Sequence, residues 1–123
     1  MIAGIGIDMV DIKRMKRWRE IPGLLERYFH ADELSAVRQK SHDAASSLAA
    51  RFAAKEAFGK ALGTGLAGMA LKDIMIKTRR NGQPELYLLD SARAALERSG
   101  AACVHVSLSH EGDNAIAMVV LEK

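Results

Sequence analysis

Residues 51–65 read RFAAKEAFGKALGTG and form the central part of the longest helical pattern in the chain, which runs from about Asp43 to Leu62. Small side chains recur on one face of this helix, at Ala50, Ala54, Ala57 and Ala61. A second apolar stripe lies on another side, at Leu48, Phe52 and Leu62. A helix with two apolar stripes is expected to be packed on both sides. Gly63-Thr64-Gly65 provides its stop signal, so the segment predicts a long central helix.

The charged residues of this helix permit two interpretations. Glu56 projects between the apolar stripes, so we expect its carboxylate to be partly shielded and to have a cation or hydrogen-bond donors beside it. Lys60 follows one turn later and predicts either an i, i+4 salt bridge with Glu56 or a phosphate contact beside a metal held by Glu56. For Arg51 and Lys55 the plainer of two interpretations is likewise a charged side chain that solvates a helix face.

The first strand is expected over about residues 2–10 and contains the stretch GIGIDMVD from Gly4 to Asp11. Alternation places Gly4, Gly6 and Asp8 on one face, and we expect the opposite face, made of Ile5, Ile7 and Met9, to lie in the core. Asp8 would then stand opposite Glu56. Such a carboxylate pair suits a magnesium ion, which takes one or two protein carboxylates. The alternative for Asp8 is a strand-end residue that accepts hydrogen bonds from nearby amides.

The remaining pattern predicts an α+β fold, a single compact domain over residues 1–123 with a largely antiparallel sheet packed by the long helix. Asp11 is expected to cap a helix over 12–19, and Asp32 a helix over about 33–40. The other expected elements are a helical turn at 24–29, strands at 71–79 and 84–89, a helix at 91–99, and strands at 102–109 and 115–121. Asn81-Gly82 is a strong hairpin signal between two of these strands.

The strand near the C-terminus carries polar groups on one face. Alternation separates Val104, Val106 and Leu108 from His105, Ser107 and Ser109. Because the chain lacks a Gly-x-Ser-x-Gly elbow, these hydroxyl and imidazole groups predict ligand contacts rather than a hydrolase triad. Zinc-type Cys/His spacing is also absent, and His30 and His42 are expected at the surface.

Composition limits the class of protein. The chain has 123 residues, a net charge of +3 and one cysteine, Cys103, which we expect to be a buried small hydrophobe. No apolar run approaches the roughly 20 residues of a membrane helix, and the N-terminus lacks the features of a signal peptide. We therefore expect a soluble cytoplasmic protein. Its positive charge is concentrated on the helix over 12–19, at Lys13, Arg14, Lys16, Arg17 and Arg19. Such a patch favours an acidic partner: nucleic acid, a phosphorylated ligand or an acidic protein.

Three segments together resemble holo-acyl carrier protein synthase, the small bacterial type of 4′-phosphopantetheinyl transferase: GIGIDMVDI at 4–12, RFAAKEAFGKALGTG at 51–65 and HVSLSHEGDNAIAMVVLE at 105–122. The resemblance covers the whole chain in the order found in the family. It implies transfer of the phosphopantetheine arm of coenzyme A to a serine of an apo acyl carrier protein, with release of adenosine 3′,5′-bisphosphate. It also implies a compact α+β homotrimer with coenzyme A between subunits, and neither nucleic acid nor membrane as a partner.

Carried over by position, the resemblance implies that Asp8 and Glu56 are the magnesium ligands and that Lys60 stabilises the leaving-group charge near the pyrophosphate. It further implies nucleotide or phosphate contacts from Arg51, Gly63, His105, Ser109 and His110, and carrier-protein docking by Lys13, Arg14 and Arg17. Two positions depart from the family pattern: Asp11 stands where glutamate is frequent, and Ile7 where threonine is often found. The serine proton has several possible acceptors, namely a metal-bound water, Glu56 or another carboxylate.

Two other functions compete with the transferase. A nucleic-acid-binding module would use the basic helix, but the chain has only three Phe, two Tyr and one Trp, and Asp8 and Glu56 would have no role. A magnesium-dependent phosphohydrolase would explain the carboxylates and Lys60 but would leave the basic helix without a function.

Overall fold

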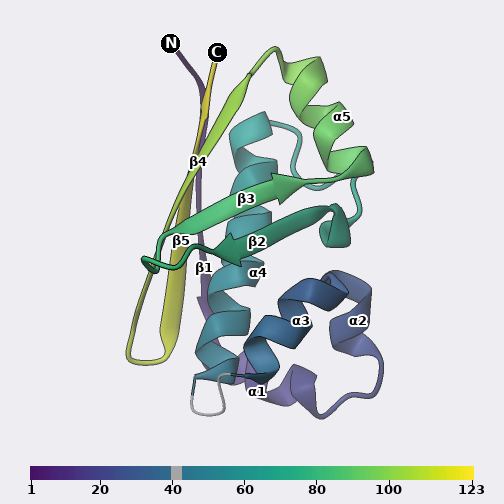
Figure 1. The fold of residues 1–123 in the computed structure, drawn as a ribbon, viewed down its shortest axis with the longest axis vertical. Coiled ribbons are helices and arrows are strands. Elements are labelled where there is room, and N and C mark those ends of the chain that lie inside the picture. Colours follow the sequence, from purple (N-terminus) through teal and green to yellow (C-terminus); the bar gives the residue numbers. More distant parts are fainter. Residues whose placement is uncertain (40–42) are drawn as a thin grey trace.

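The computed structural model describes residues 1–39 and 43–123. In chain order, its elements are β1 (Ile2–Asp11), α1 (Ile12–Arg19), α2 (Leu24–Tyr28), α3 (Ala31–Arg38), α4 (Ala44–Leu62), a 3₁₀ turn η1 (Leu71–Asp73), β2 (Ile74–Thr78), β3 (Pro84–Leu88), α5 (Asp90–Ser99), β4 (Cys103–Glu111) and β5 (Asn114–Glu122) (Figure 1). The predicted α+β class, the element order and the long central helix are confirmed. His42 and the predicted helix end at residue 40 lie outside the described residues.

The strands form two antiparallel sheets rather than one. A three-stranded sheet has the order β1-β5-β4, and β2 pairs with β3 in a separate hairpin, which crosses in front of α4 in Figure 1. The predicted Asn81-Gly82 turn closes this hairpin, with Gly82 at φ 89°. The first strand, β1, pairs directly with the last strand, β5, and the amide of Lys123 donates to the carbonyl of Met1 at 2.8 Å. Among the described residues, no helix is long and apolar enough to cross a membrane.

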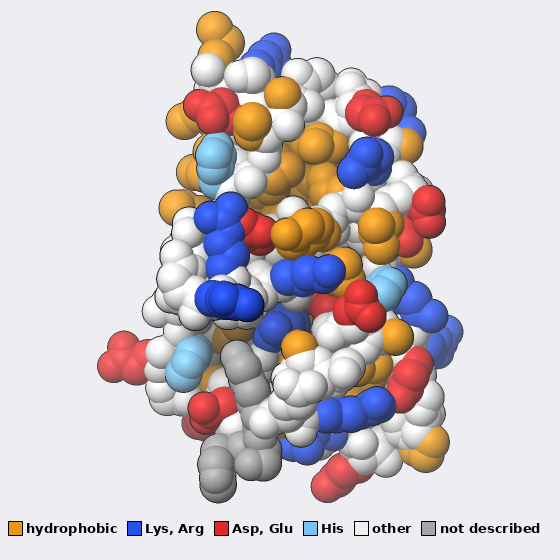
Figure 2. Space-filling view, viewed as in Figure 1, with side chains coloured by type: hydrophobic (Ala, Val, Ile, Leu, Met, Phe, Trp, Pro, Cys, Tyr) orange, Lys and Arg blue, Asp and Glu red, His pale blue; other side chains and the backbone are white. Residues whose placement is uncertain are grey.

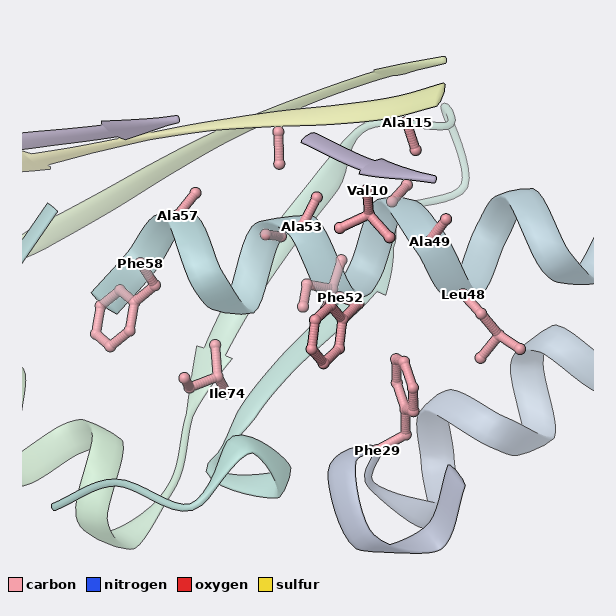
Figure 3. Close-up of a cluster of buried hydrophobic side chains, with 14 of the residues drawn as sticks. Val10, Phe29, Leu48, Ala49, Phe52, Ala53, Ala57, Phe58, Ile74 and Ala115 are labelled. Carbon is pink, nitrogen blue, oxygen red and sulfur yellow. The ribbon is translucent and has the colours of Figure 1, made fainter. Parts of the chain in front are cut away.

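The helix α4 lies unusually close to β1 because glycine removes the side chains between them. A Cβ atom on Gly6 would stand 2.0 Å from the carbonyl oxygen of Ala57, and one on Gly4 would stand 2.0 Å from that of Ala61. Figure 3 shows Ala57 and other alanines of α4 pointing toward the strands. The predicted small-residue stripe therefore packs directly against the glycine face of β1.

This close contact reverses the predicted orientation of β1. The prediction that Ile5, Ile7 and Met9 lie in the core is wrong, because their exposed fractions are 62%, 54% and 63%. Only the face without bulky side chains can approach the backbone of α4, so the large apolar residues point to the other side of the sheet. We call this side the outer face. Cys103 was predicted to be buried but is exposed at the first residue of β4.

The opposite side of α4 packs against helices α1–α3 through larger side chains. Phe52 and Leu48 point away from the three-stranded sheet in Figure 3, and Phe29 approaches Phe52 from α2. The ring centroid of Trp18 lies 5.1 Å from that of Phe52 and 5.3 Å from that of Tyr28. The two predicted apolar sides of α4 thus contact two different layers, as expected for a central helix.

A buried ion pair joins α3 to α4. Lys55 was predicted to solvate a helix face, but its side chain is 0% exposed. Its ammonium group donates to Glu33 Oε1 at 2.7 Å, to the carbonyl of Leu71 at 2.9 Å and to the carbonyl of Ile74. The second carboxylate oxygen of Glu33 accepts from the amide of Ile76 at 3.1 Å. The charge is buried because carbonyls and a carboxylate replace its water shell.

Side chains cap the two helices for which capping was predicted. Asp11 caps α1 as predicted, accepting from the amide of Lys13 at 2.9 Å. For α3 the predicted cap Asp32 is wrong, because His30 precedes the helix and its Nδ1 accepts from the amide of Asp32 at 3.0 Å. Glu33 accepts from the amide of His30 at 3.0 Å and completes a capping box.

Candidate active site

The end of β1 and the second half of α4 bring Asp8 and Lys60 into contact. Lys60 Nζ donates to Asp8 Oδ1 at 2.9 Å and to the carbonyl of Ile7 at 3.0 Å. The side chain of Asp8 is 19% exposed and that of Lys60 is 53% exposed. Among the described residues, no ion pair joins Lys60 to Glu56, so the predicted i, i+4 bridge is replaced by a contact with the strand.

Glu56 completes what we call the carboxylate–lysine cluster: Asp8, Glu56 and Lys60. Partial burial raises the pKa of the Glu56 carboxyl, and the negative charge of Asp8 raises it further. The positive charges of Arg14 and Lys60 oppose this rise in pKa. The predicted partial shielding of Glu56 is confirmed, and its two nearby cations act through space. The cluster therefore places two mutually repelling carboxylates beside the ammonium group of a half-exposed lysine.

A second group of predicted residues lines a cavity of about 260 Å³ at the other end of α4. We call it the Arg51 cavity; its lining includes Arg51, Ser47, Ala50, Thr78, Gly82, Pro84, Ser109 and His110. Three of the predicted nucleotide contacts thus come together: Arg51, Ser109 and His110. The hairpin β2–β3 contributes the wall that sequence alone did not predict.

Arg51 is buried rather than solvated, which corrects the sequence prediction. Its side chain donates through Nη1 to Ser47 Oγ, and the residue is only 4% exposed. Its buried Nε has no hydrogen-bond partner among the described residues. Burial lowers the pKa of the guanidinium, and the negative charge of Glu33 opposes that effect. A desolvated guanidinium with an unsatisfied donor at a cavity is suited to an anion such as a phosphate.

Gly63 follows the carboxylate–lysine cluster on α4, where its amide donates to the carbonyl of Lys60 at 3.0 Å, whereas His105 belongs to neither group. Gly63 ends α4 in the left-handed region at φ 80° and is exposed. His105 lies on the outer face of β4, where its Nε2 is 3.0 Å from Glu122 Oε1. This hydrogen bond lowers the pKa of the Glu122 carboxyl, assisted by the charge of His105 when protonated. The chain therefore does not bring every predicted ligand contact together in a single pocket.

The basic helix α1 lies next to the carboxylate–lysine cluster. Arg14 is half-buried, with its guanidinium 4.7 Å from the ring centroid of Trp18 and 5.1 Å from that of Phe52. Lys13 is 3.4 Å from Asp113, and Arg17 is exposed. The sequence placed Arg14 on a free surface and missed its proximity to Glu56. The spacing of Arg14 four residues before Trp18 was the available signal.

Comparison with known proteins defines the class. Residues 4–119 match the family model of the 4′-phosphopantetheinyl transferase superfamily, and the chain belongs to that superfamily. It is 52% identical over 122 residues to the holo-[acyl-carrier-protein] synthase of Treponema denticola, covering 99% of each chain. The crystal structure of the Neisseria meningitidis synthase covers 100% of both chains with a TM-score of 0.89 and 37% identity.

A third relative adds a ligand complex. The Bacillus anthracis synthase, crystallised in complex with CoA (3′,5′-ADP), has a TM-score of 0.83 and 33% identity and covers 99% of this chain and 97% of its own. Within the superfamily, the chain is thus an enzyme of the holo-acyl carrier protein synthase group. This result favours the transferase over the nucleic-acid-binding module and the phosphohydrolase.

Proposed function

We propose that the enzyme transfers the 4′-phosphopantetheine group of coenzyme A to a serine hydroxyl of an apo acyl carrier protein and releases adenosine 3′,5′-bisphosphate. The observation that carries this proposal is the convergence of Asp8, Glu56 and Lys60 between β1 and α4. In the reaction the serine oxygen bonds to the β-phosphorus, and the bond from that phosphorus to the bridging oxygen breaks. The bridging oxygen leaves with the electron pair, and a base accepts the serine proton.

The two carboxylates fit a magnesium ion. Because burial and the charge of Asp8 raise the pKa of the Glu56 carboxyl, a bound cation between the two carboxylates would favour the ionised form of Glu56. Magnesium binds through one or two carboxylates and leaves other positions to water and phosphate oxygens. Asp8 and Glu56 would hold the ion, which would neutralise and orient the diphosphate.

Lys60 is proposed to bind the pyrophosphate and to stabilise the negative charge on the leaving group. Its ammonium group donates to the Asp8 carboxylate, and its half-exposed side chain can reach toward a ligand. A positive group already placed where negative charge develops lowers the barrier without reorganising in the transition state. Asp8 therefore belongs to the proposed metal site and also holds Lys60 beside that site.

The Arg51 cavity is proposed to receive a phosphate of the nucleotide. Arg51 supplies a buried guanidinium with an unpartnered Nε, and Ser109 and His110 line the same cavity. Gly63 and His105 remain proposed contacts for the part of coenzyme A outside this cavity. These assignments predict that Arg51→Lys raises the KM for coenzyme A more than it lowers kcat, because lysine lacks the planar set of donors.

The enzyme is proposed to be a homotrimer with active sites between subunits. Large apolar side chains are exposed on one face of β1 and β5, where Ile5, Ile7 and Met9 are joined by Met118 on the paired strand. A contiguous apolar face of this kind is typical of a subunit interface. The Arg51 cavity shares no lining residue with the carboxylate–lysine cluster, so a neighbouring subunit would complete each site. His105 would then lie at this interface.

The exposed cations of α1 are proposed to dock the acidic carrier protein. Arg17 provides the sharper test, because Arg14 also packs on Trp18 and its reversal to glutamate would remove that packing contact as well as the charge. Arg17→Glu should weaken carrier binding several-fold and leave coenzyme A binding unchanged. Lys72→Glu, at an exposed residue of η1, is the matched charge-reversal control. Equal losses for carrier and coenzyme A would contradict a docking role.

A cytoplasmic location belongs to this proposal and agrees with a single cysteine that has no disulfide.

The intact mass of the carrier tests the proposed reaction. Apo acyl carrier protein is incubated with the enzyme, coenzyme A and Mg²⁺, and the carrier should gain the mass of phosphopantetheine. Absence of that gain would overturn the function. Glu56→Gln should remove most of the activity, and Glu97→Gln, an exposed carboxylate on α5, should retain it. Full activity in Glu56→Gln would refute the metal assignment but not the transferase.

A further inference from the structure

The Asp8 carboxylate contacts one cation, the ammonium group of Lys60, and is proposed to bind a second, the magnesium ion. The ammonium group of Lys60 is 2.9 Å from Asp8 Oδ1 and is also anchored by the carbonyl of Ile7 at 3.0 Å. Because Asp8 is only 19% exposed, few positions around its carboxylate remain open to solvent or to a metal. A divalent ion on Asp8 would therefore lie close to the positive charge of Lys60.

We propose that Lys60 competes with the metal ion for Asp8, and that the pyrophosphate of coenzyme A relieves this competition by attracting Lys60 away from the carboxylate. Metal and coenzyme A then bind cooperatively, with Lys60 as the group that couples them. This inference rests on the proposed function, because it takes the diphosphate as the ligand that attracts Lys60.

The charges of the region support the coupling. The negative charges of Asp8 and Glu56 are balanced by the positive charges of Lys60 and Arg14, which both act on Glu56. A divalent ion alone would give the cluster an excess of positive charge, and the doubly negative pyrophosphate would remove that excess. Each ligand therefore lowers the cost of binding the other, and the coupling must be the same in both directions.

The conformation of Lys60 makes the exchange feasible. Its side chain is 53% exposed, so its flexible stem is not enclosed by packing and can turn toward a bound phosphate. The buried Lys55 on the same helix offers a contrast, because a carboxylate and two carbonyls hold it in place. Of these two lysines, Lys60 alone has both a contact with a proposed metal ligand and room to leave it.

Binding of Mn²⁺, measured by electron paramagnetic resonance without carrier protein, tests the competition. Lys60→Met should bind Mn²⁺ about fivefold more tightly than the wild type, which corresponds to an ion pair of about 1 kcal/mol. Arg14→Met is the matched control, because it removes a charge that acts on Glu56 but does not contact Asp8. Its effect should be clearly smaller. Asp8→Asn should remove the site and thereby show that the measured Mn²⁺ is bound there.

The same titration with coenzyme A tests the coupling. The wild type should bind Mn²⁺ more tightly when coenzyme A is present, and this gain should shrink in Lys60→Met. Unchanged Mn²⁺ affinity in Lys60→Met, or an equal increase in Arg14→Met, would overturn the competition. If circular dichroism shows that Lys60→Met is unfolded, Lys60→Gln replaces it with the same expected direction. Since Mn²⁺ binding requires no turnover, failure here is distinct from failure of the carrier mass assay.

Discussion

The buried pair of Lys55 and Glu33 should be the most sensitive point of the fold. Glu33→Gln keeps the shape of the side chain but removes the charge that compensates Lys55, which is 0% exposed. The carbonyls of Leu71 and Ile74 would remain as acceptors, yet neither carries a full negative charge. Leaving a buried charge without its partner costs about 3–5 kcal/mol in the free energy of unfolding. For a domain stable by about 5–15 kcal/mol, this loss is large.

A double-mutant cycle isolates the pair. Lys55→Met should cost less than Glu33→Gln, because the amides of His30 and Ile76 still donate to the Glu33 carboxylate. Lys55→Met combined with Glu33→Gln should recover part of the loss, since no buried charge remains. The exposed Glu97→Gln is the control and should stay within about 0.5 kcal/mol of the wild type.

Urea unfolding followed by far-ultraviolet circular dichroism measures these changes at one fixed protomer concentration, because oligomer stability depends on concentration. The reasoning would be refuted if Glu33→Gln cost less than about 1 kcal/mol, a value typical of an exposed ion pair. Strict additivity of the two single changes would also contradict it, because residues in direct contact are expected to be coupled.

Three further perturbations address the strand, the site and the interface. Gly6→Ala should lower the free energy of unfolding by more than about 3 kcal/mol, roughly the cost of severe overpacking, because its Cβ would stand 2.0 Å from the carbonyl oxygen of Ala57. Gly63→Ala is the control in the same urea assay. A Cβ there has open space, so the change should cost only about 1–2 kcal/mol for the left-handed φ of 80°. Because the pKa of the Glu56 carboxyl is raised in the folded protein, the folded state binds the carboxyl proton more tightly than the unfolded chain does. The contribution of Glu56 to stability therefore falls as the pH rises above the ordinary pKa of 4.5. Without metal, Glu56→Gln should therefore raise the Tm more at pH 7 than at pH 4, and an equal change at both values would contradict the assignment. Ile7→Glu, on the outer face, should shift the sedimentation coefficient to that of a monomer; an unchanged coefficient would exclude this face as the interface.

The sequence predicted the elements whose signals are local. The apolar stripes and Gly63 defined α4, and the Asn81-Gly82 turn defined the hairpin. Orientation across the sheet was a different matter, because a period of two separates two faces without saying which one contacts a helix. The alternating Gly4 and Gly6, read together with the alanine stripe of α4, contained the answer.

Contacts between distant segments were not predictable in the same way. Lys55 and Glu33 lie 22 residues apart, and nothing in either helix alone marks them as partners. For the site, Glu56 and Lys60 alone were compatible with a simple salt bridge as well as with a metal and a phosphate. The family resemblance was needed to choose the metal and phosphate site. The contact of Lys60 with Asp8 depends on how β1 lies on α4, so only the structure could distinguish it from the bridge to Glu56.

The direct contact between the backbones of β1 and α4 has a consequence for engineering. In most proteins the distance between two packed elements can be tuned by enlarging or trimming the side chains between them. At Gly6 and Ala57 there is no such spacer, because the carbonyl oxygen of the helix occupies the position of the missing Cβ. The separation between the backbones that carry Asp8 and Lys60 is thus set by peptide dimensions. Redesign of substrate choice is therefore best directed at the Arg51 cavity and α1, where side chains still determine the shape.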